Sequence, residues 1–486
     1  MSISSKHTRL AAGIVLACAL FLACPRGGTA LTVTDPGITG AVENELRHDP
    51  GVEAHRVDVT TEQGVVTLSG VVNNILAKER AARVAETVKG VRLVVNEITV
   101  QPSPLTDQTI RESVNTALTM DPATESYKVE VVVDDGRVIL SGKAASSQEK
   151  ELAATVAKGV AGVTDLVNTI EVKPRGVRTD AEIKAEIEQS LKWNALVDHE
   201  FITVHVQDGE VSLQGTVDSA AEKDQAVSEA WTSGVAAVDA EALLVEVPEE
   251  ISPPDQRPDV SDLAVGRAVK RRMLSHPRLE SFELEVTVTD GVVSLSGAVD
   301  NLKAKRTAAE VAENTTGVLR VRNLIRVRPD DMPSDAAIHV DVEAALLREP
   351  YVEADQVSVA VDNGRLTLSG TVDTAFERAQ AEDAAARVKG VIAIENNLLV
   401  DDAEAYYRDP YVDEDWRFEA APSRSQPAVS GKSDWEIAED IREELWWSPY
   451  VDSAQVEVDV DNGLAILSGT VDTMEEWAAA RSNAYE

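Results

Sequence analysis

The sequence has 486 residues, of which 43% are hydrophobic and 27% charged, a balance that suits folded domains rather than a disordered chain. Acidic residues outnumber basic ones by 84 to 46, so the net charge is −38. Because a field of this sign repels phosphate groups, it argues against a nucleic-acid-binding protein and against broad, charge-driven adhesion to anionic lipid.

The first 30 residues are predicted to be an export signal. Lys6 and Arg9 precede an uncharged, mostly apolar stretch over 10–23, which is too short to span a bilayer comfortably and has the length of a signal-peptide core. Cleavage after Ala30 would release a soluble chain, whereas the Leu-Ala-Cys that ends at Cys24 resembles a bacterial lipobox and would place a lipid on Cys24. A retained anchor is the third alternative. No later apolar run is long enough to cross a bilayer, so we expect no transmembrane segment after the signal.

Both cysteines, Cys18 and Cys24, lie inside this predicted signal. The rest of the sequence has none, which excludes a disulfide framework, a cysteine-ligated metal and a cysteine nucleophile from the folded part.

The remaining sequence repeats one unit six times. The marker of each copy is a short strand that ends in Leu-x-Gly, and a second glycine always precedes the marker glycine by six residues. An Ile or Val always stands 32 residues before the marker glycine. The paired glycines, which we interpret as structural turn positions, are Gly64 and Gly70, Gly136 and Gly142, Gly209 and Gly215, Gly291 and Gly297, Gly364 and Gly370, and Gly463 and Gly469.

Each copy begins with a predicted amphipathic helix. From its first apolar residue, Ile38 in the first copy, apolar residues recur at four and eight positions along, which places them on one face. Thr179 and Glu182 have the spacing of a capping box, and a matching pair begins the sixth copy. In the first copy, Asp35 is predicted to cap the helix before a first-turn proline, Pro36.

Two strands and a hairpin turn follow the helix. The strands alternate apolar and polar residues, and five copies join them by Asp-Gly or Asn-Gly, as at Asp135–Gly136. This dipeptide is a strong hairpin signal, because the tight turn needs positive φ.

A second helix, predicted over 77–89 in the first copy, is rich in Ala, Glu, Lys and Arg. We expect it to end at a glycine with a left-handed conformation; the candidates are Gly90, Gly162, Gly234, Gly317 and Gly390. A last strand then carries an asparagine and two alternating apolar residues, as at Asn96, Ile98 and Val100, although the third copy has Asp239–Ala240 instead.

The order helix–strand–strand–helix–strand predicts an α+β fold of tandem αββαβ modules, each a three-stranded mixed sheet covered by two helices. Each module has enough residues for its own core. The predicted organisation is a signal over 1–30, modules over 34–101, 106–173, 178–246, 260–328 and 334–401, a disordered acidic and aromatic linker over 402–432, and an incomplete module over 433–486.

These motifs resemble the BON domain family, named for bacterial osmotically inducible and nodulation proteins. The resemblance rests on the Asp/Asn-Gly-x-Val-x-Leu-Ser-Gly segment, the alanine-rich helix and the Val-x-Asn-x-Ile-x-Val ending, and it covers nearly all of 34–401 and 433–486. It implies the αββαβ fold, no catalysis, and a periplasmic or outer-membrane-attached location in a Gram-negative-type bacterium. It also implies roles in phospholipid association, envelope integrity, osmotic stress or the chaperoning of outer-membrane proteins.

The sixth copy is shorter than the others, because its helix-ending glycine would fall at position 489 and its last strand is missing. Three interpretations stay open: another chain supplies the strand, the module is loosely folded, or the reading frame is truncated.

Residues that could carry chemistry are scattered. His199 and His205, with Glu200, could be imagined as a metal site, but no third ligand has matching spacing. The segment 459–463 resembles the start of a calcium loop, yet the same position is a hairpin turn in every copy. No catalytic or phosphate-binding motif is present, so we predict no catalytic residue, no metal, no cofactor and no enzyme activity.

Aromatic residues gather near the C-terminal end: 11 of the 19 lie between 401 and 486. In the sixth copy the apolar helix stripe is already complete, so Trp446 and Trp447, with Trp435 and Tyr450 near the helix ends, are candidate lipid or partner contacts. The alternative is that they pack inside the module or against the linker.

The sequence therefore predicts a non-enzymatic envelope binding protein that contacts phospholipid headgroups or envelope proteins through several modules. The rival prediction is a chaperone or scaffold for outer-membrane proteins, and cation sensing is a third possibility for which no ligand set is visible. The oligomeric state is left open.

Overall fold

The computed structural model describes residues 33–124, 128–173, 178–246, 260–329, 331–400, 432–461, 463–471 and 473–484. The predicted signal, Cys24 and all but one residue of the predicted 402–432 linker lie outside these residues. The described part consists of six modules in chain order. The predicted α+β class, with small mixed sheets and paired helices, is confirmed.

Module 1 contains α1 (Asp35–His48), η1 (Ala54–Arg56), β1 (Val57–Glu62), β2 (Val65–Val72), α2 (Ile75–Glu86), β3 (Leu93–Asn96) and β4 (Thr99–Val100). Module 2 contains α3 (Asp107–Met120), β5 (Lys128–Asp134), β6 (Arg137–Ala144), α4 (Ser147–Lys158), β7 (Asp165–Asn168) and β8 (Glu171–Val172). Module 3 contains α5 (Asp180–Trp193), η2 (His199–Phe201), β9 (Ile202–Gln207), β10 (Glu210–Val217), α6 (Ala220–Ala230), β11 (Ala237–Asp239) and β12 (Leu243–Val245).

Module 4 contains α7 (Asp262–Ser275), β13 (Glu285–Thr289), β14 (Val292–Ser296), β15 (Ala298–Val299), α8 (Leu302–Glu313), β16 (Arg320–Asn323) and β17 (Arg326–Val327). Module 5 contains α9 (Asp335–Arg348), η3 (Ala354–Gln356), β18 (Val357–Asp362), β19 (Arg365–Val372), α10 (Ala375–Ala386) and β20 (Ala393–Val400). Module 6 contains α11 (Asp434–Trp447), η6 (Ser453–Gln455), β21 (Val456–Asp461), β22 (Leu464–Gly469) and α12 (Met474–Asn483).

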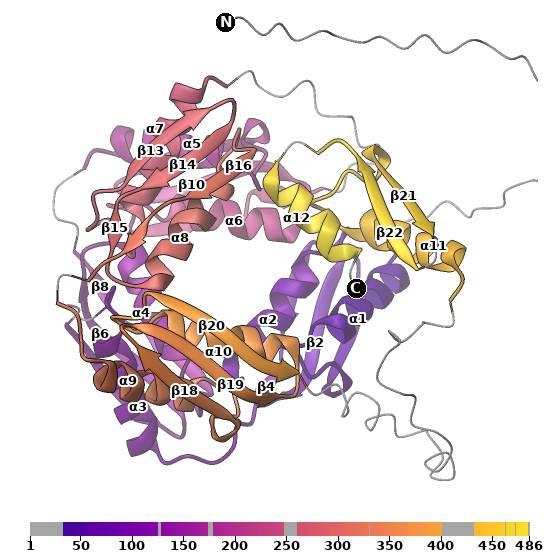
Figure 1. Cartoon of the computed structure of the whole chain (residues 1–486). Coiled ribbons are helices and arrows are strands. Elements are labelled where there is room, and N and C mark those ends of the chain that lie inside the picture. The colour runs from indigo at the N-terminus through magenta and orange to yellow at the C-terminus, as the bar shows by residue number, and fades with distance from the viewer. Residues whose placement is uncertain are drawn as a thin grey trace, which may run out of the picture. The chain divides into compact units, whose positions relative to one another are not determined.

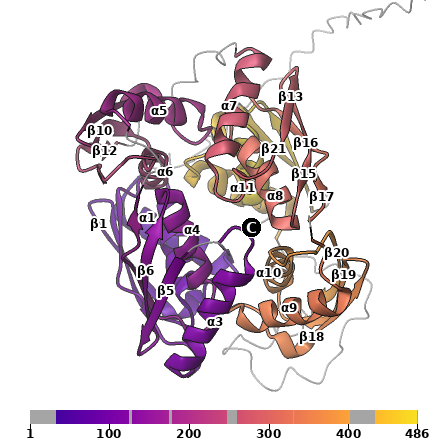
Figure 2. The ribbon, with the colours of Figure 1, turned by 90° about the vertical axis from the view of Figure 1, so that its left-hand side faces the viewer.

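Within modules 1–5 the second strand is central. It pairs antiparallel with the first strand and parallel with the last, as Val59↔Leu68 and Leu68↔Asn96 show in module 1. The two helices cover one face of the sheet, which Figure 1 shows for module 5 and Figure 2 for α7 and α8 beside the strands of module 4. The predicted helix stripe is buried against the sheet, so Ile38, Val42 and Leu46 form part of the module 1 core.

The first residue of each first helix clamps the hairpin turn. Asp35 accepts hydrogen bonds from the backbone N–H groups of Gln63 (2.8 Å) and Gly64 (2.9 Å), both of which have positive φ. Equivalent aspartates make the same contact in the other modules; these are Asp107, Asp180, Asp262, Asp335 and Asp434. The prediction that Asp35 caps α1 is therefore wrong: Thr34 is the N-cap, and its hydroxyl accepts from the Gly37 N–H.

The marker glycine at the end of Leu-x-Gly allows two backbones to approach closely. Gly70 has φ of 125°, and a Cβ built there would lie 2.1 Å from the carbonyl oxygen of Arg56. Only a residue without a side chain fits this contact.

The second helices end earlier than predicted. In module 1, α2 ends at Glu86, and Gly90 follows four residues later with φ of 93°. The turn between them directs Val88 and Val91 into the core, where both are buried. The backbone N–H groups of Val88 and Val91 bond to the carbonyls three residues before them, so the chain continues after Glu86 in tight turns rather than as an α-helix.

The last strand is divided in two in modules 1–4, which the pattern did not predict. Asn96 lies at the break: its side-chain amide donates to the Lys78 carbonyl of α2 (2.7 Å), and its Oδ1 accepts from the Ile98 N–H (3.2 Å). Asn168, Asn323 and Asn396 make the same pair of hydrogen bonds. The asparagine therefore ties the last strand to the second helix, and in module 5 it does so while β20 stays continuous.

Each module has its own apolar cluster, but a few side chains cross between modules. Ala220 of module 3 and Trp447 of module 6 belong to the module 1 cluster, and Ile75 of module 1 belongs to that of module 2. Each module thus has its own apolar core, and the modules also pack against one another.

Candidate functional site

The structure separates the four aromatic residues that the sequence singled out. Trp435 lies in the first turn of α11 and is 70% exposed. Trp447, at the end of the same helix, is buried in the apolar cluster of module 1, and Trp446 packs half-buried against that cluster. The Trp446 and Trp447 rings meet edge to face, 4.8 Å apart, whereas Tyr450 is half-buried. A lipid or partner contact by these residues remains a prediction.

A row of arginines in module 4 is the strongest surface feature that sequence reasoning missed. Side chains of the last strand alternate between the two faces of the sheet, and Val321, Ile325 and Val327 pack against the module 4 core. The outward positions are Arg320, Arg322, Leu324, Arg326 and Arg328, all of them exposed. We call these five residues the arginine row.

The arginine row lies beside uncharged side chains. On the central strand, Val292 is opposite Arg320, Ser294 is opposite Arg322, and Ala298 is opposite Arg326. Among the residues that the structure describes, none forms a hydrogen bond or ion pair with these four guanidinium groups. Four full positive charges are therefore available to an outside partner, although the whole chain carries −38.

Leu324 gives the arginine row an apolar centre. Its side chain is 63% exposed, with two arginines on either side of it along the strand. Outward side chains two residues apart on a strand are separated by roughly 7 Å. Arg320 and Arg322 lie on β16, Arg326 lies on β17 and Arg328 follows it, so the four arginines flank Leu324 at the break between the two strands. Each guanidinium group can form paired hydrogen bonds to phosphate oxygens.

The sequence contained a signal for this surface. The segment Arg-Val-Arg-Asn-Leu-Ile-Arg-Val-Arg over 320–328 has an arginine at four of its five odd positions. The inward residues Asn323, Ile325 and Val327 indicate the last strand, and the charge lies at the positions between them. The matching outward rows of modules 1, 2 and 5 contain one basic side chain in the described chain, Lys173.

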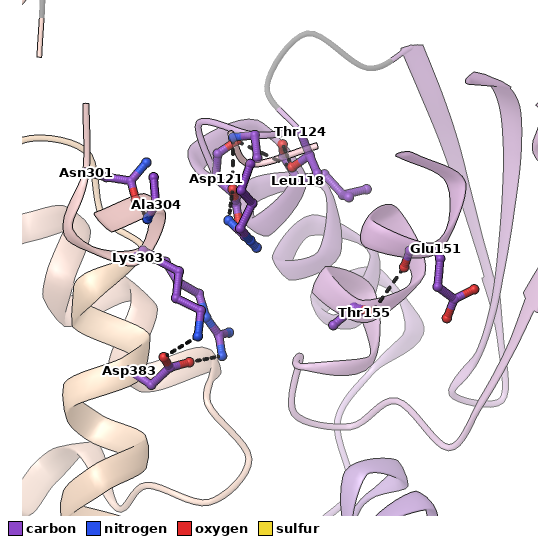
Figure 3. Close-up of polar contacts among 12 residues, drawn as sticks. Leu118, Asp121, Thr124, Glu151, Thr155, Asn301, Lys303, Ala304 and Asp383 are labelled. Atoms are coloured by element: carbon purple, nitrogen blue, oxygen red, sulfur yellow. Dashed lines mark hydrogen bonds and ion pairs between the residues drawn. The ribbon is translucent and has the colours of Figure 1, made fainter. Parts of the chain in front are cut away.

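A second charged cluster joins modules 2, 4 and 5, and its groups already have partners (Figure 3). Arg278 donates two hydrogen bonds to the Asp121 carboxylate, at 2.9 and 2.8 Å, and both side chains are buried. Asp383 accepts from Lys303 (2.9 Å) and from Arg387 (2.6 Å). Burial alone would raise the pKa of the Asp383 carboxyl, but Arg387 and Lys303 hold it below its usual range. These ion pairs join module 2 to module 4 and module 4 to module 5, so we interpret the cluster as a docking contact between modules.

Glu349 borders this cluster, and its pKa is shifted in the opposite direction from that of Asp383. Burial is the main reason that its pKa rises from 4.5 to about 7, with Asp383 adding to the effect and Arg387 opposing it. Its Oε2 atom lies 3.9 Å from Arg387, and its Oε1 atom is buried without a hydrogen-bond partner. The side chain lines a cavity of about 220 Å³ between modules 2 and 5.

The residues that the structure describes contain neither a metal-binding cluster nor a membrane-spanning helix. No three of their His, Cys, Asp and Glu side chains are grouped so as to hold a metal ion, and His199 and His205 join no such group. In the same residues, every helix is too short or too polar to cross a bilayer.

Comparison with known proteins yields one family and several partial relatives. A family model described as the BON domain matches residues 34–102, 106–174, 179–246, 261–329, 334–402 and 433–484. Osmotically-inducible protein Y of Escherichia coli is 31% identical over 145 residues, which make up 29% of this chain and 72% of that protein. Outer membrane lipoprotein DolP of Haemophilus influenzae is 30% identical over 181 residues, 32% of this chain and 93% of that protein.

A solved structure of CdsD, a structural protein of the type III secretion system of Chlamydia trachomatis, covers 43% of this chain and 92% of its own with 17% identity. Its TM-score is 0.13, and a likeness at that level supports no argument. The family matches, by contrast, coincide with the six repeated modules and extend over most of the sequence. The chain therefore belongs to the BON domain family.

Proposed function

We propose that this protein is an envelope-associated binding protein that contacts anionic phospholipid surfaces through the arginine row of module 4. The proposal is carried by one observation: four exposed arginines without partners in the described chain flank an exposed leucine along the divided last strand of module 4. The similarity to a protein named as an outer membrane lipoprotein supports the envelope location. The predicted signal supports export.

The net charge of −38 limits how such a contact can work. At physiological ionic strength charges are screened over about 8 Å, so the acidic remainder of the molecule repels a membrane weakly once the arginine row touches it. Each arginine near an anionic surface contributes about 1 kcal/mol, so four contribute about 4 kcal/mol, or roughly a thousandfold in affinity. The contact should be local, oriented by module 4 and sensitive to salt.

The test is co-sedimentation of the full chain with vesicles of phosphatidylcholine, with and without phosphatidylglycerol. We expect binding to the anionic vesicles that weakens as salt is raised. Changing Arg320, Arg322, Arg326 and Arg328 to Gln should abolish it. The matched control changes four exposed basic residues of other modules, Arg111, Lys192, Arg365 and Arg378, to Gln and so alters the net charge equally.

Vesicle binding by the two variants shows whether the interaction depends on the arginine row itself or on the net charge of the chain. If both lose binding to the same extent, net charge governs the interaction and the arginine row is not a site. If the wild-type chain does not sediment with anionic vesicles, the lipid function is wrong. A Leu324→Ser variant should weaken binding by about tenfold or less, because it removes one partly inserted apolar side chain.

A further inference from the structure

Glu349 occupies a position that recurs in the modules, the residue directly after the first helix. The equivalent residues of modules 1 and 2 are Asp49 and Asp121. Arg80 donates to both carboxylate oxygens of Asp49, at 2.6 and 2.7 Å. Arg278 does the same for Asp121, at 2.9 and 2.8 Å. In both modules a guanidinium group thus satisfies the carboxylate at this position.

The carboxyl group of Glu349 lacks such a match. Its Oε2 atom lies 3.9 Å from Arg387, and the backbone N–H of Tyr351 also faces the group. Arg387 itself donates to Asp383 at 2.6 Å, so its charge is already compensated. Glu349 is 4% exposed, and its Oε1 atom accepts no hydrogen bond within the described chain. Because a buried acceptor without a partner is costly, this oxygen points to a donor from outside the chain.

The cavity of about 220 Å³ that Glu349 lines lies where four helices end. Met120 is the last residue of α3, and Gly159 directly follows α4. Arg348 is the last residue of α9, and Arg387 directly follows α10. All four residues line the cavity. Because the C-terminal end of a helix carries a partial negative charge, the convergence of four such ends favours a cation.

The size and the wall of the cavity favour a short aliphatic molecule. Cavities for drug-sized ligands measure about 300–1,000 Å³, so this cavity suits a smaller molecule. Buried apolar side chains such as Val156 and Val160 form part of its wall. Three charged side chains, Asp341, Arg348 and Lys389, also line it, but they are half-buried. Water and salt therefore screen their charges more than they screen the buried Glu349 carboxyl.

We propose that this cavity binds a small aliphatic molecule with a primary ammonium group, which donates a hydrogen bond to Oε1 of Glu349. A hydrogen bond between an ammonium group and a carboxylate is roughly twice as strong as one between neutral groups. The carbon chain of the ligand lies against the buried valines and so leaves water. Binding of such a molecule is independent of the proposed lipid contact, because the cavity and the arginine row share no residue.

Isothermal titration calorimetry of the full chain, with isoamylamine as the ligand, tests the proposal. At about pH 8 the Glu349 carboxyl, whose pKa is about 7, is mostly ionised. We expect isoamylamine to bind, whereas isocaproate, which has the same carbon chain with a carboxylate in place of the ammonium group, should not. Glu349→Gln should weaken binding of the amine by about tenfold or more, whereas Glu353→Gln, at an exposed position of the same module, should leave it unchanged. No binding of the amine, or equal binding of the two compounds, overturns the proposal.

A backbone contact between modules 2 and 5 shows whether a variant keeps the cavity. The Ala161 N–H of module 2 donates to the Arg348 carbonyl of module 5 at 2.8 Å, so amide exchange at Ala161 reports on their docking. In the wild-type chain isoamylamine should slow this exchange, since the ligand contacts both modules. If Glu349→Gln loses protection at Ala161, then Ala345→Leu decides the question, because it narrows the cavity and keeps the carboxyl. Loss of binding in Ala345→Leu with Ala161 still protected supports the site, and unchanged binding rejects it.

Discussion

At the scale of single residues, one carboxylate per module links a helix to a distant turn. Asp335 begins α9, and its two oxygens accept from the N–H groups of Asn363 (2.8 Å) and Gly364 (2.9 Å). These N–H groups point away from the hairpin ladder, because both residues have positive φ. The aspartate therefore satisfies two donors, and its removal leaves them to water.

Replacing Asp335 by Ala should lower the free energy of unfolding of module 5 by about 1–3 kcal/mol, since two charge-assisted hydrogen bonds are lost. Amide exchange at Asn363 and Gly364 measures the local effect, and denaturant unfolding measures the total. Asp355→Ala removes the same charge from an exposed position of the same module and is the matched control. Equal losses in the two variants would contradict the clamp.

At the scale of elements, module docking depends on the ends of helices and the loops beside them. Asp121 is the C-cap residue of α3, and Arg278 follows α7 in another module. Their side chains are 5% and 9% exposed, so the doubly hydrogen-bonded pair is shielded from water. Such a buried ion pair stabilises the folded chain little more than apolar packing would. Removing one member is strongly destabilising, because the other charge then stays buried without a partner.

Arg278→Ala should destabilise the chain by about 3–5 kcal/mol, because the Asp121 carboxylate then stays buried without its partner. The double variant Asp121→Ala and Arg278→Ala should recover part of that loss. Denaturant unfolding of the wild type, both single variants and the double variant completes the cycle. Strict additivity of the two single losses would show that the pair does not act as a unit.

At the scale of the whole molecule, two carboxyl groups buried near other modules make the stability of the folded chain depend on pH. Burial is the main cause that raises the pKa of Glu349 from 4.5 to about 7. It also raises the pKa of Glu86 in module 1 to about 7, with the nearby Asp224 of module 3 adding to the rise. Below pH 4.5 both groups are protonated in the folded and unfolded states alike, so the stability they provide is fully present. It is lost as the pH rises through about 7.

The chain should therefore become less stable between about pH 5 and pH 8, with Glu349 contributing up to about 3 kcal/mol of the change. Glu349→Gln should flatten that part of the profile, because an amide does not ionise. Glu353→Gln, at an exposed position of the same module, should leave the profile as it is. Thermal unfolding across this pH range measures the difference, and a profile unchanged by Glu349→Gln would refute the link.

The modules could be predicted from the sequence because local physics determines them. The spacing of Ile38, Val42 and Leu46 requires a helix with one apolar face, and the Asp-Gly turns require a hairpin. The capping boxes at Thr179 and Ser433 are formed as predicted. Even the aspartate clamp had a signal, since every copy has Asp three residues before its first apolar helix position.

Only the tertiary structure decided which surfaces stay free. Trp435 and Trp447 both lie near an end of the same helix, so the sequence does not distinguish them. In the structure Trp435 is exposed, whereas Trp447 is buried in the apolar cluster of module 1. The sequence shows that arginines recur at every second position of the arginine row. Whether they have partners depends on side chains far away in the sequence. Local periodicity sets how a short segment folds, whereas the pairing of modules depends on contacts hundreds of residues apart, such as that between Lys89 and Trp447.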